Sequence, residues 1–127
     1  QLAVSTNAPA VQYDGIPAGE TLVPEVNVSV SLDGGVGTNC DSSHVSAFLR
    51  RTKIDGRSVI GGPARKRCNV VRGGPSPDAD FSVSCDLSFY DVLMYGNESF
   101  EGHIELYTSA GYDVDLRIVP FSFTLTP

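Results

Sequence analysis

Few residues in this 127-residue chain have side chains suited to acid–base or nucleophilic chemistry. Its two histidines are His44 and His103, and histidine is the side chain whose ordinary pKa suits a base at neutral pH. The segment Asp-Ser-Ser-His at 41–44 holds the residue types of a hydrolase triad. Residues this close in sequence cannot easily form the chain of nucleophile, base and orienting acid that the mechanism needs. We therefore predict that the protein is not an enzyme.

Motifs for metals and nucleotides are also weak. The acidic pairs at 78–80 and 113–115 do not supply the ligand loop that calcium requires. The three cysteines lie too far apart in sequence for the short CxxC pairs of zinc sites. The glycine-rich segments 33–37 and 73–77 are predicted to be loops, because neither joins a strand to a helix as a nucleotide site does. We predict no metal and no cofactor.

The cysteines favour an oxidising compartment. Cys85 falls in the middle of a predicted strand and points toward the core. We predict a disulfide between Cys68 and Cys85, since a strand over 67–72 could neighbour the Cys85 strand and bring the Cα atoms within roughly 4.4–6.8 Å. Cys40 is then left over, either buried and inert, which we favour, or free to cross-link two chains.

Two N-glycosylation sequons begin at Asn27 and Asn97. Together with the cysteines, they predict a glycoprotein that is secreted or displayed on a cell or virion surface. No secretion signal precedes the first apolar residues after Gln1, so we expect a mature or trimmed form. No run approaches the roughly 18 apolar residues of a membrane span.

Basic residues are concentrated in one segment. Eight of the nine lie between positions 50 and 72, where the only acid is Asp55, so this segment has a charge of +7. The remainder, with one basic residue and fourteen acids, has a charge of −13. We predict that the basic residues contact a ligand or partner; they are Arg50, Arg51, Lys53, Arg57, Arg65, Lys66, Arg67 and Arg72.

The Asp55-Gly56 turn signal predicts a hairpin that places the basic residues on neighbouring strands as an exposed cationic stripe. Such a stripe would attract an acidic protein partner or a sulfated polysaccharide. Nucleic acid is disfavoured, because no aromatic residues alternate with the basic ones and the other surface is acidic. Alternatively, the stripe only protects a sheet edge from aggregation.

Alternation of apolar and polar residues predicts strands over 26–32 and 81–89, with shorter examples near 45–49 and 104–106. Residues 107–112 are predicted to form a hairpin turn. In the last strand the alternation shifts at Val119-Pro120, where we expect a bulge or a sheet edge. No convincing amphipathic helix is present.

About eight short strands in residues 1–127 predict one all-β domain, an antiparallel two-sheet β-sandwich of the immunoglobulin-like or Greek-key type. A small barrel is the alternative. An immunoglobulin domain proper is not expected, because tryptophan is absent and the cysteines are too close in sequence.

We predict a non-enzymatic binding module that uses the basic hairpin at 50–72. The alternative is a self-associating structural subunit of a pilus, fibre, coat or envelope, in which complementary charged faces join the copies.

Overall fold

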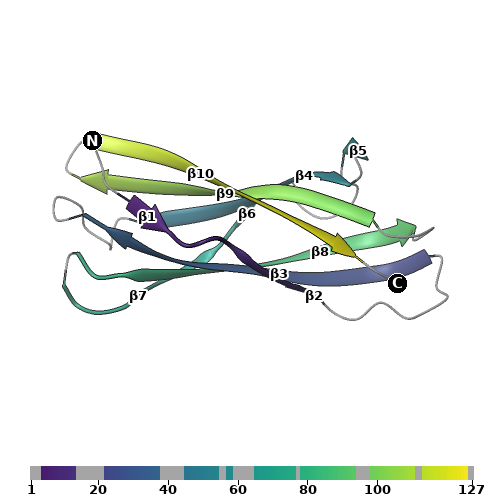
Figure 1. Ribbon diagram of the computed structural model, residues 1–127, viewed down its shortest axis with the longest axis horizontal. Coiled ribbons are helices and arrows are strands. Elements are labelled where there is room, and N and C mark those ends of the chain that lie inside the picture. The colour runs from purple at the N-terminus through teal and green to yellow at the C-terminus, as the bar shows by residue number, and fades with distance from the viewer. Residues whose placement is uncertain are drawn as a thin grey trace.

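The computed structural model describes residues 4–13, 22–37, 45–54, 57–58, 65–76, 78–93, 98–110 and 113–125. These residues contain ten strands and no helix, and therefore no helix that could cross a membrane. The strands form two antiparallel sheets that pack face to face (Figure 1).

The first sheet is built from β1 (Val4–Thr6), β2 (Ala10–Tyr13), β3 (Leu22–Val36), β7 (Asn69–Arg72) and β8 (Phe81–Leu93). Its order is β1–β3–β8–β7, and β2 also pairs with β3. The second sheet is built from β4 (Ser46–Ile54), β5 (Arg57–Ser58), β6 (Arg65–Arg67), β9 (Glu98–Ala110) and β10 (Asp113–Leu125). Its order is β10–β9–β4–β5, and β6 also pairs with β4.

This arrangement matches the immunoglobulin-like sandwich. With β1 and β2 counted as one interrupted strand, the first sheet has the order ABED and the second has the order GFC. The predicted fold class is therefore confirmed, and the barrel alternative is wrong. The strands are longer than predicted, since β3, β8, β9 and β10 each run for 13 to 15 residues.

The core lies between the two sheets and follows the predicted alternation. Every second residue is buried over 26–32 of β3 and 81–87 of β8, and these residues meet Ala47, Leu49, Ile104 and Leu106 of the second sheet; the buried residues are Val26, Val28, Val30, Leu32, Phe81, Val83, Cys85 and Leu87. Burying a Val, Leu or Phe side chain stabilises the fold by about 1.5–3 kcal/mol. Two patterned strands per sheet therefore hold the sandwich together.

The glycine-rich segment 33–37 corrects the sequence prediction, because β3 continues through it to Val36. Gly34 pairs with Thr6 on one side and with Phe81 on the other. A Cβ atom at Gly34 would lie 2.5 Å from Cζ of Phe81, so glycine lets β3 pass the buried ring. The predicted turn over 107–112 is also too long, since β9 continues to Ala110.

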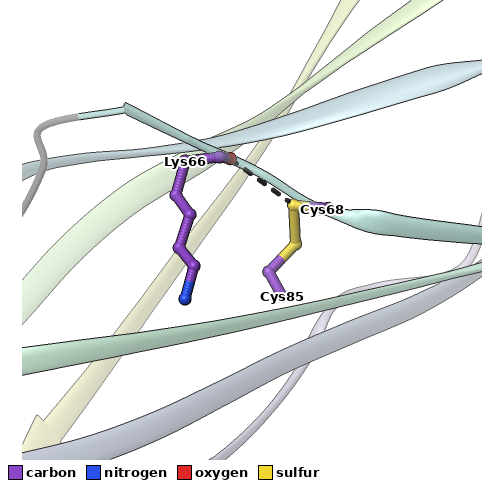
Figure 2. The surroundings of a disulfide bond; sticks show 3 residues. All are labelled: Lys66, Cys68 and Cys85. Atoms are coloured by element: carbon purple, nitrogen blue, oxygen red, sulfur yellow. Dashed lines mark hydrogen bonds between the residues drawn. A yellow bond between two sulfur atoms is a disulfide. The ribbon is translucent and has the colours of Figure 1, made fainter.

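The disulfide between Cys68 and Cys85 is present as predicted, with Cα atoms 4.6 Å apart (Figure 2). Cys68 lies where the chain leaves the second sheet, after β6, and enters the first sheet as β7. Its N–H donates to the carbonyl of Ala47 in β4 at 2.8 Å, while its sulfur is bonded to β8. The bond therefore ties the two sheets together at the crossing. Cys40 lies outside the described residues.

Strand β10 forms one edge of the second sheet and pairs with β9 from Asp113 to Leu125 without a register shift. Of the two expectations for Val119-Pro120, the edge is confirmed and the bulge is wrong. A register shift does occur in β4, between Arg51 and Lys53. Because the β9–β10 ladder is regular, the parity of each β10 residue decides which face its side chain occupies.

Candidate functional site

The outer face of the second sheet, which points away from the first sheet, brings together arginine, aromatic and exposed aliphatic side chains. Its centre is an arginine–aromatic cluster drawn from three strands, consisting of Phe48, Arg50, Arg65, Arg67, Glu105 and Tyr107. The strand register explains the gathering, since Phe48 of β4 lies beside both Glu105 of β9 and Arg67 of β6. Arg50 likewise lies beside Arg65. Alternation on three adjacent strands therefore builds the cluster.

Glu105 is the acid at the centre of this cluster, and its side chain is only 11% exposed. Its Oε1 accepts a hydrogen bond from Nε of Arg65 at 2.9 Å, and its Oε2 lies 3.5 Å from Nε of Arg50. Nε2 of His103 lies 3.7 Å from Oε2. The Arg65 hydrogen bond lowers the pKa of Glu105 despite opposing desolvation, and the charge of Arg50 adds to the effect. The same hydrogen bond raises the pKa of Arg65.

Aromatic rings order the arginines. The guanidinium of Arg65 lies 3.7 Å from the centroid of the Phe48 ring, and that of Arg67 lies 5.2 Å from it. The rings of Phe48 and Tyr107 meet edge to face, with centroids 5.8 Å apart. Cation–π contacts of this kind contribute about 0.5–1 kcal/mol at exposed sites. Arginine and tyrosine are enriched in protein–protein interfaces.

The structure only partly brings the predicted basic residues together. The expected pairing of the two basic clusters is confirmed, because β6 pairs with β4. Arg50, Arg65 and Arg67 share the cluster, but Arg72 donates to the carbonyl oxygens of Pro75 and Ser76 at 3.3 and 2.7 Å. The side chains of Arg51, Lys53 and Arg57 lie outside the described part of the chain.

Lys66 stands between two cluster arginines in β6 but points to the other side. Figure 2 shows its side chain running toward the first sheet, where it borders a shallow depression with Asp86 and Ser88. The predicted cationic stripe is therefore only partly formed, for two reasons. Lys66 and Arg72 leave it, and Glu105 neutralises part of it from a strand distant in sequence. The binding role of these residues stays a prediction.

The first half of β10 adds an apolar stripe to the same outer face. Val114, Leu116 and Ile118 are 70%, 46% and 47% exposed. Further along the strand, Val119 and Phe121 are buried. The apolar residues change parity while the ladder does not, so the first half presents its apolar side to solvent. The sequence showed the shift, and we expected a bulge or a sheet edge there; the structure has the edge and no bulge.

The charged residues of this half take the opposite side. Asp115 and Arg117 alternate with the stripe and are exposed at the margin between the two sheets. Nη1 of Arg117 donates to the carbonyl oxygen of Val4 in β1. The Asp115 carboxylate accepts a hydrogen bond from the N–H of Leu116 at 2.9 Å. This half of β10 is therefore inverted, with its apolar side chains on the outer face and its charged side chains on the side that faces the first sheet.

The sequon residue Asn27 is exposed on β3, on the outer face of the first sheet, where it accepts a hydrogen bond from Ser88 Oγ at 2.7 Å. Asn97 lies outside the described residues. Glycosylation of either residue stays a prediction. Within the described ranges, no group of three or more His, Cys, Asp or Glu residues could hold a metal ion.

Fold and surface together define an immunoglobulin-like β-sandwich with one outer face of arginine, aromatic and aliphatic side chains. No protein-family model matches the chain, and no curated protein matches it in sequence. Among solved structures, the chain is similar to AggA, the major subunit of aggregative adherence fimbriae type I from Escherichia coli. The sequence identity is 12% and the TM-score is 0.46, over 99% of this chain and 93% of that subunit.

Proposed function

We propose that this chain is a non-enzymatic subunit of a protein assembly on a cell or particle surface, and that its copies associate through the β10 side of the second sheet, where the outer face carries the apolar stripe. The observation that carries the proposal is the apolar stripe on β10. Three neighbouring aliphatic side chains are exposed on an edge strand. Natural proteins usually protect such edges, because an exposed apolar edge strand is a template for pairing with another chain.

The disulfide supports a location outside the reducing cytosol. Cys68 and Cys85 are bonded, and structural disulfides persist mainly in secreted, periplasmic or surface proteins. Closing a loop between residues 17 positions apart stabilises a fold by about 3 kcal/mol in the chain-entropy description. An assembly subunit that works outside the cell would benefit from this stabilisation.

Self-association of the purified chain tests this proposal. Light scattering after size-exclusion chromatography should give a mass above that of one chain, rising with protein concentration. Val114→Ser should lower this mass, because it removes part of the apolar stripe. Val71→Ser is the matched control, since Val71 is 56% exposed on β7 of the first sheet. A chain that stays monomeric at all concentrations, or equal effects of both variants, would refute the proposal.

A second candidate function is binding of an acidic partner by the arginine–aromatic cluster. It is favoured by Arg67, which is exposed and lies over Phe48 rather than in the ion pairs around Glu105. An acidic protein surface fits this mixture of aromatic and cationic groups. A sulfated polysaccharide is the other source of anionic groups, and a binding measurement with Arg67 variants tests it (see Discussion).

A further inference from the structure

The first half of β10 has a sequence that complements itself in antiparallel pairing. Over residues 113–119 it reads Asp-Val-Asp-Leu-Arg-Ile-Val. When two such strands are turned antiparallel about Leu116, each Asp115 faces an Arg117 of the other copy, and each Val114 faces an Ile118. We propose that two copies of this chain pair β10 with β10 about a two-fold axis at Leu116. This inference rests on the proposed function and specifies its contact.

The backbone of β10 is turned the right way for this pairing. Among the described strands, β10 pairs on one side only, with β9. Pro120 takes its place in that ladder without a register shift, although proline has no N–H to donate. Its nitrogen must therefore face the free edge, as is usual for proline in edge strands. Residues of the same parity, including Leu116, then direct their N–H and C=O groups to that edge.

A second observation agrees with this parity. The Leu116 N–H donates to the side chain of its own neighbour, Asp115. In the pair, two Leu116 residues would instead exchange backbone hydrogen bonds with each other. Asp115 and Arg117 would become a non-hydrogen-bonded pair, in which side chains approach most closely. Arg117 has five N–H donors, so it can keep its bond to Val4 and still reach the partner's carboxylate.

The charged residues favour this register over pairings centred on the adjacent residues. Centring the pair on residue 115 or 117 places two aspartates or two arginines opposite each other. Centring it on residue 114 places Asp113 opposite Asp115. Like charges directly opposite each other destabilise a strand pair. Pro120 limits the pairing from the other side, because it cannot donate to a partner strand. Only the pairing about Leu116 makes two opposite-charge pairs and three apolar pairs.

The pairing of the two β10 strands also covers part of the exposed apolar stripe. In the pair, the two apolar stripes lie side by side on the outer face and place six aliphatic side chains in contact. Leu116 is already opposite Tyr107 within its own sheet. The second sheets of the two copies would form one continuous sheet, with both arginine–aromatic clusters on the same side. Figure 1 shows the first half of β10 along the border of the molecule, where a second copy can approach.

Cysteine cross-linking tests the two-fold axis. Each variant is made in a Cys40→Ser background to remove the remaining thiol. In the pair, the two Leu116 Cα atoms should lie about 5.5 Å apart, within disulfide range. Mild oxidation of Leu116→Cys should therefore give a covalent dimer on a non-reducing gel. Val114→Cys is the control, because its two copies would be more than about 13 Å apart. Equal cross-linking of both variants, or none for Leu116→Cys, would overturn the register.

Mixing charge variants tests the ion pairs. Asp115→Arg alone puts two arginines opposite each other, and Arg117→Asp alone puts two aspartates opposite each other. Each variant should raise the dimer dissociation constant about tenfold or more in sedimentation equilibrium. An equimolar mixture should restore the dimer, since each copy then meets the opposite charge. A loss through disturbed folding would not be restored by mixing, and circular dichroism of each variant checks the fold.

The outcomes separate this inference from the proposed function. If the wild-type chain associates but Leu116→Cys does not cross-link and mixing restores nothing, the strand pairing is wrong and assembly occurs elsewhere. If the wild-type chain is monomeric at every concentration, both proposals are wrong.

Discussion

The two sheets present similar residues to the core but different residues to solvent. The outer face of the first sheet carries small polar side chains in exposed positions, namely Asn27, Ser29, Ser31, Ser82, Ser84 and Asp86. Ser82 and Ser88 make hydrogen bonds across the strands to Asp33 and Asn27. The outer face of the second sheet carries the arginine–aromatic cluster and the apolar stripe instead.

This difference indicates where the protein makes contacts. A face built mainly of serine, asparagine and aspartate stays hydrated, and its exposed large hydrophobic residues, Val71 and Tyr90, are separated along the strands rather than gathered in a stripe. In the second sheet, the carboxylate of Glu105 is held by two arginines, and Val114, Leu116 and Ile118 remain in water. Covering exposed aliphatic and ordered arginine side chains with a partner gives a favourable free energy of association. The inner faces account for folding, and the outer face of the second sheet is the candidate for recognition.

The largest expected difference in the free energy of unfolding is between variants in the two halves of β10. Phe121 is buried and stacks with Phe123, which in turn stacks with Phe100 at 5.2 Å. Phe121→Ala should lower the free energy of unfolding by about 3–5 kcal/mol, because it leaves a cavity. Leu116→Ala should change it by less than about 0.5 kcal/mol in dilute monomer. Urea denaturation measures both values, and similar losses would show that the exposed half also supports the fold.

Removal of the disulfide should have the next largest effect on the free energy of unfolding, because the bond links the two sheets. Replacing Cys68 and Cys85 together by alanine should lower the free energy of unfolding by about 3 kcal/mol. Guanidinium denaturation of the double variant measures this loss. A change below about 1 kcal/mol would mean that the hydrogen bond from Cys68 to Ala47 and the packed sheets hold the crossing without the bond.

Glu105 should have a moderate effect that depends on pH. Glu105→Gln should lower the free energy of unfolding by about 1–2 kcal/mol at pH 7, since it weakens charge-assisted hydrogen bonds. Because folding lowers the pKa of Glu105, its contribution is present above the unfolded value of about 4.3 and is lost as the pH falls through the lower folded value. The stabilities of the wild type and the variant should therefore converge in acid. Asp86→Asn, on the other sheet, is the control and should change stability by less than about 0.5 kcal/mol.

The smallest effect on stability is expected for Arg67→Ser, within about 0.5 kcal/mol. If the cluster binds anionic groups, this variant should elute from a heparin column at lower salt than the wild type. Lys66→Ser removes the same charge from the same strand but on the other side, and should elute later than Arg67→Ser. Wild-type protein that passes through heparin at physiological salt would exclude the sulfated polysaccharide and leave an acidic protein surface as the partner to test.

Local pattern was sufficient to predict much of the fold. The alternation in 26–32 and 81–87 identified the two central strands and their inward residues, because side-chain direction in a strand depends only on parity. The pairing of Cys68 with Cys85 also followed from local spacing, since β7, which begins directly after Cys68, is joined by a short connection to β8, which carries Cys85. The segment around Gly34 was wrongly predicted to be a loop. The strand needs glycine there because the Phe81 ring approaches closely, and that ring comes from a strand distant in sequence.

The sequence by itself determined the strand periodicity, the β-sandwich class, the disulfide and the concentration of basic residues near β4 and β6. Only the tertiary structure decided what surrounds those basic residues, because Glu105 reaches them through pairing of β9 with β4, across half of the chain. The tertiary structure also decided that the first half of β10 faces outward. A regular ladder with β9 fixes the parity of every residue in β10, so Val114, Leu116 and Ile118 could turn inward only by breaking that ladder.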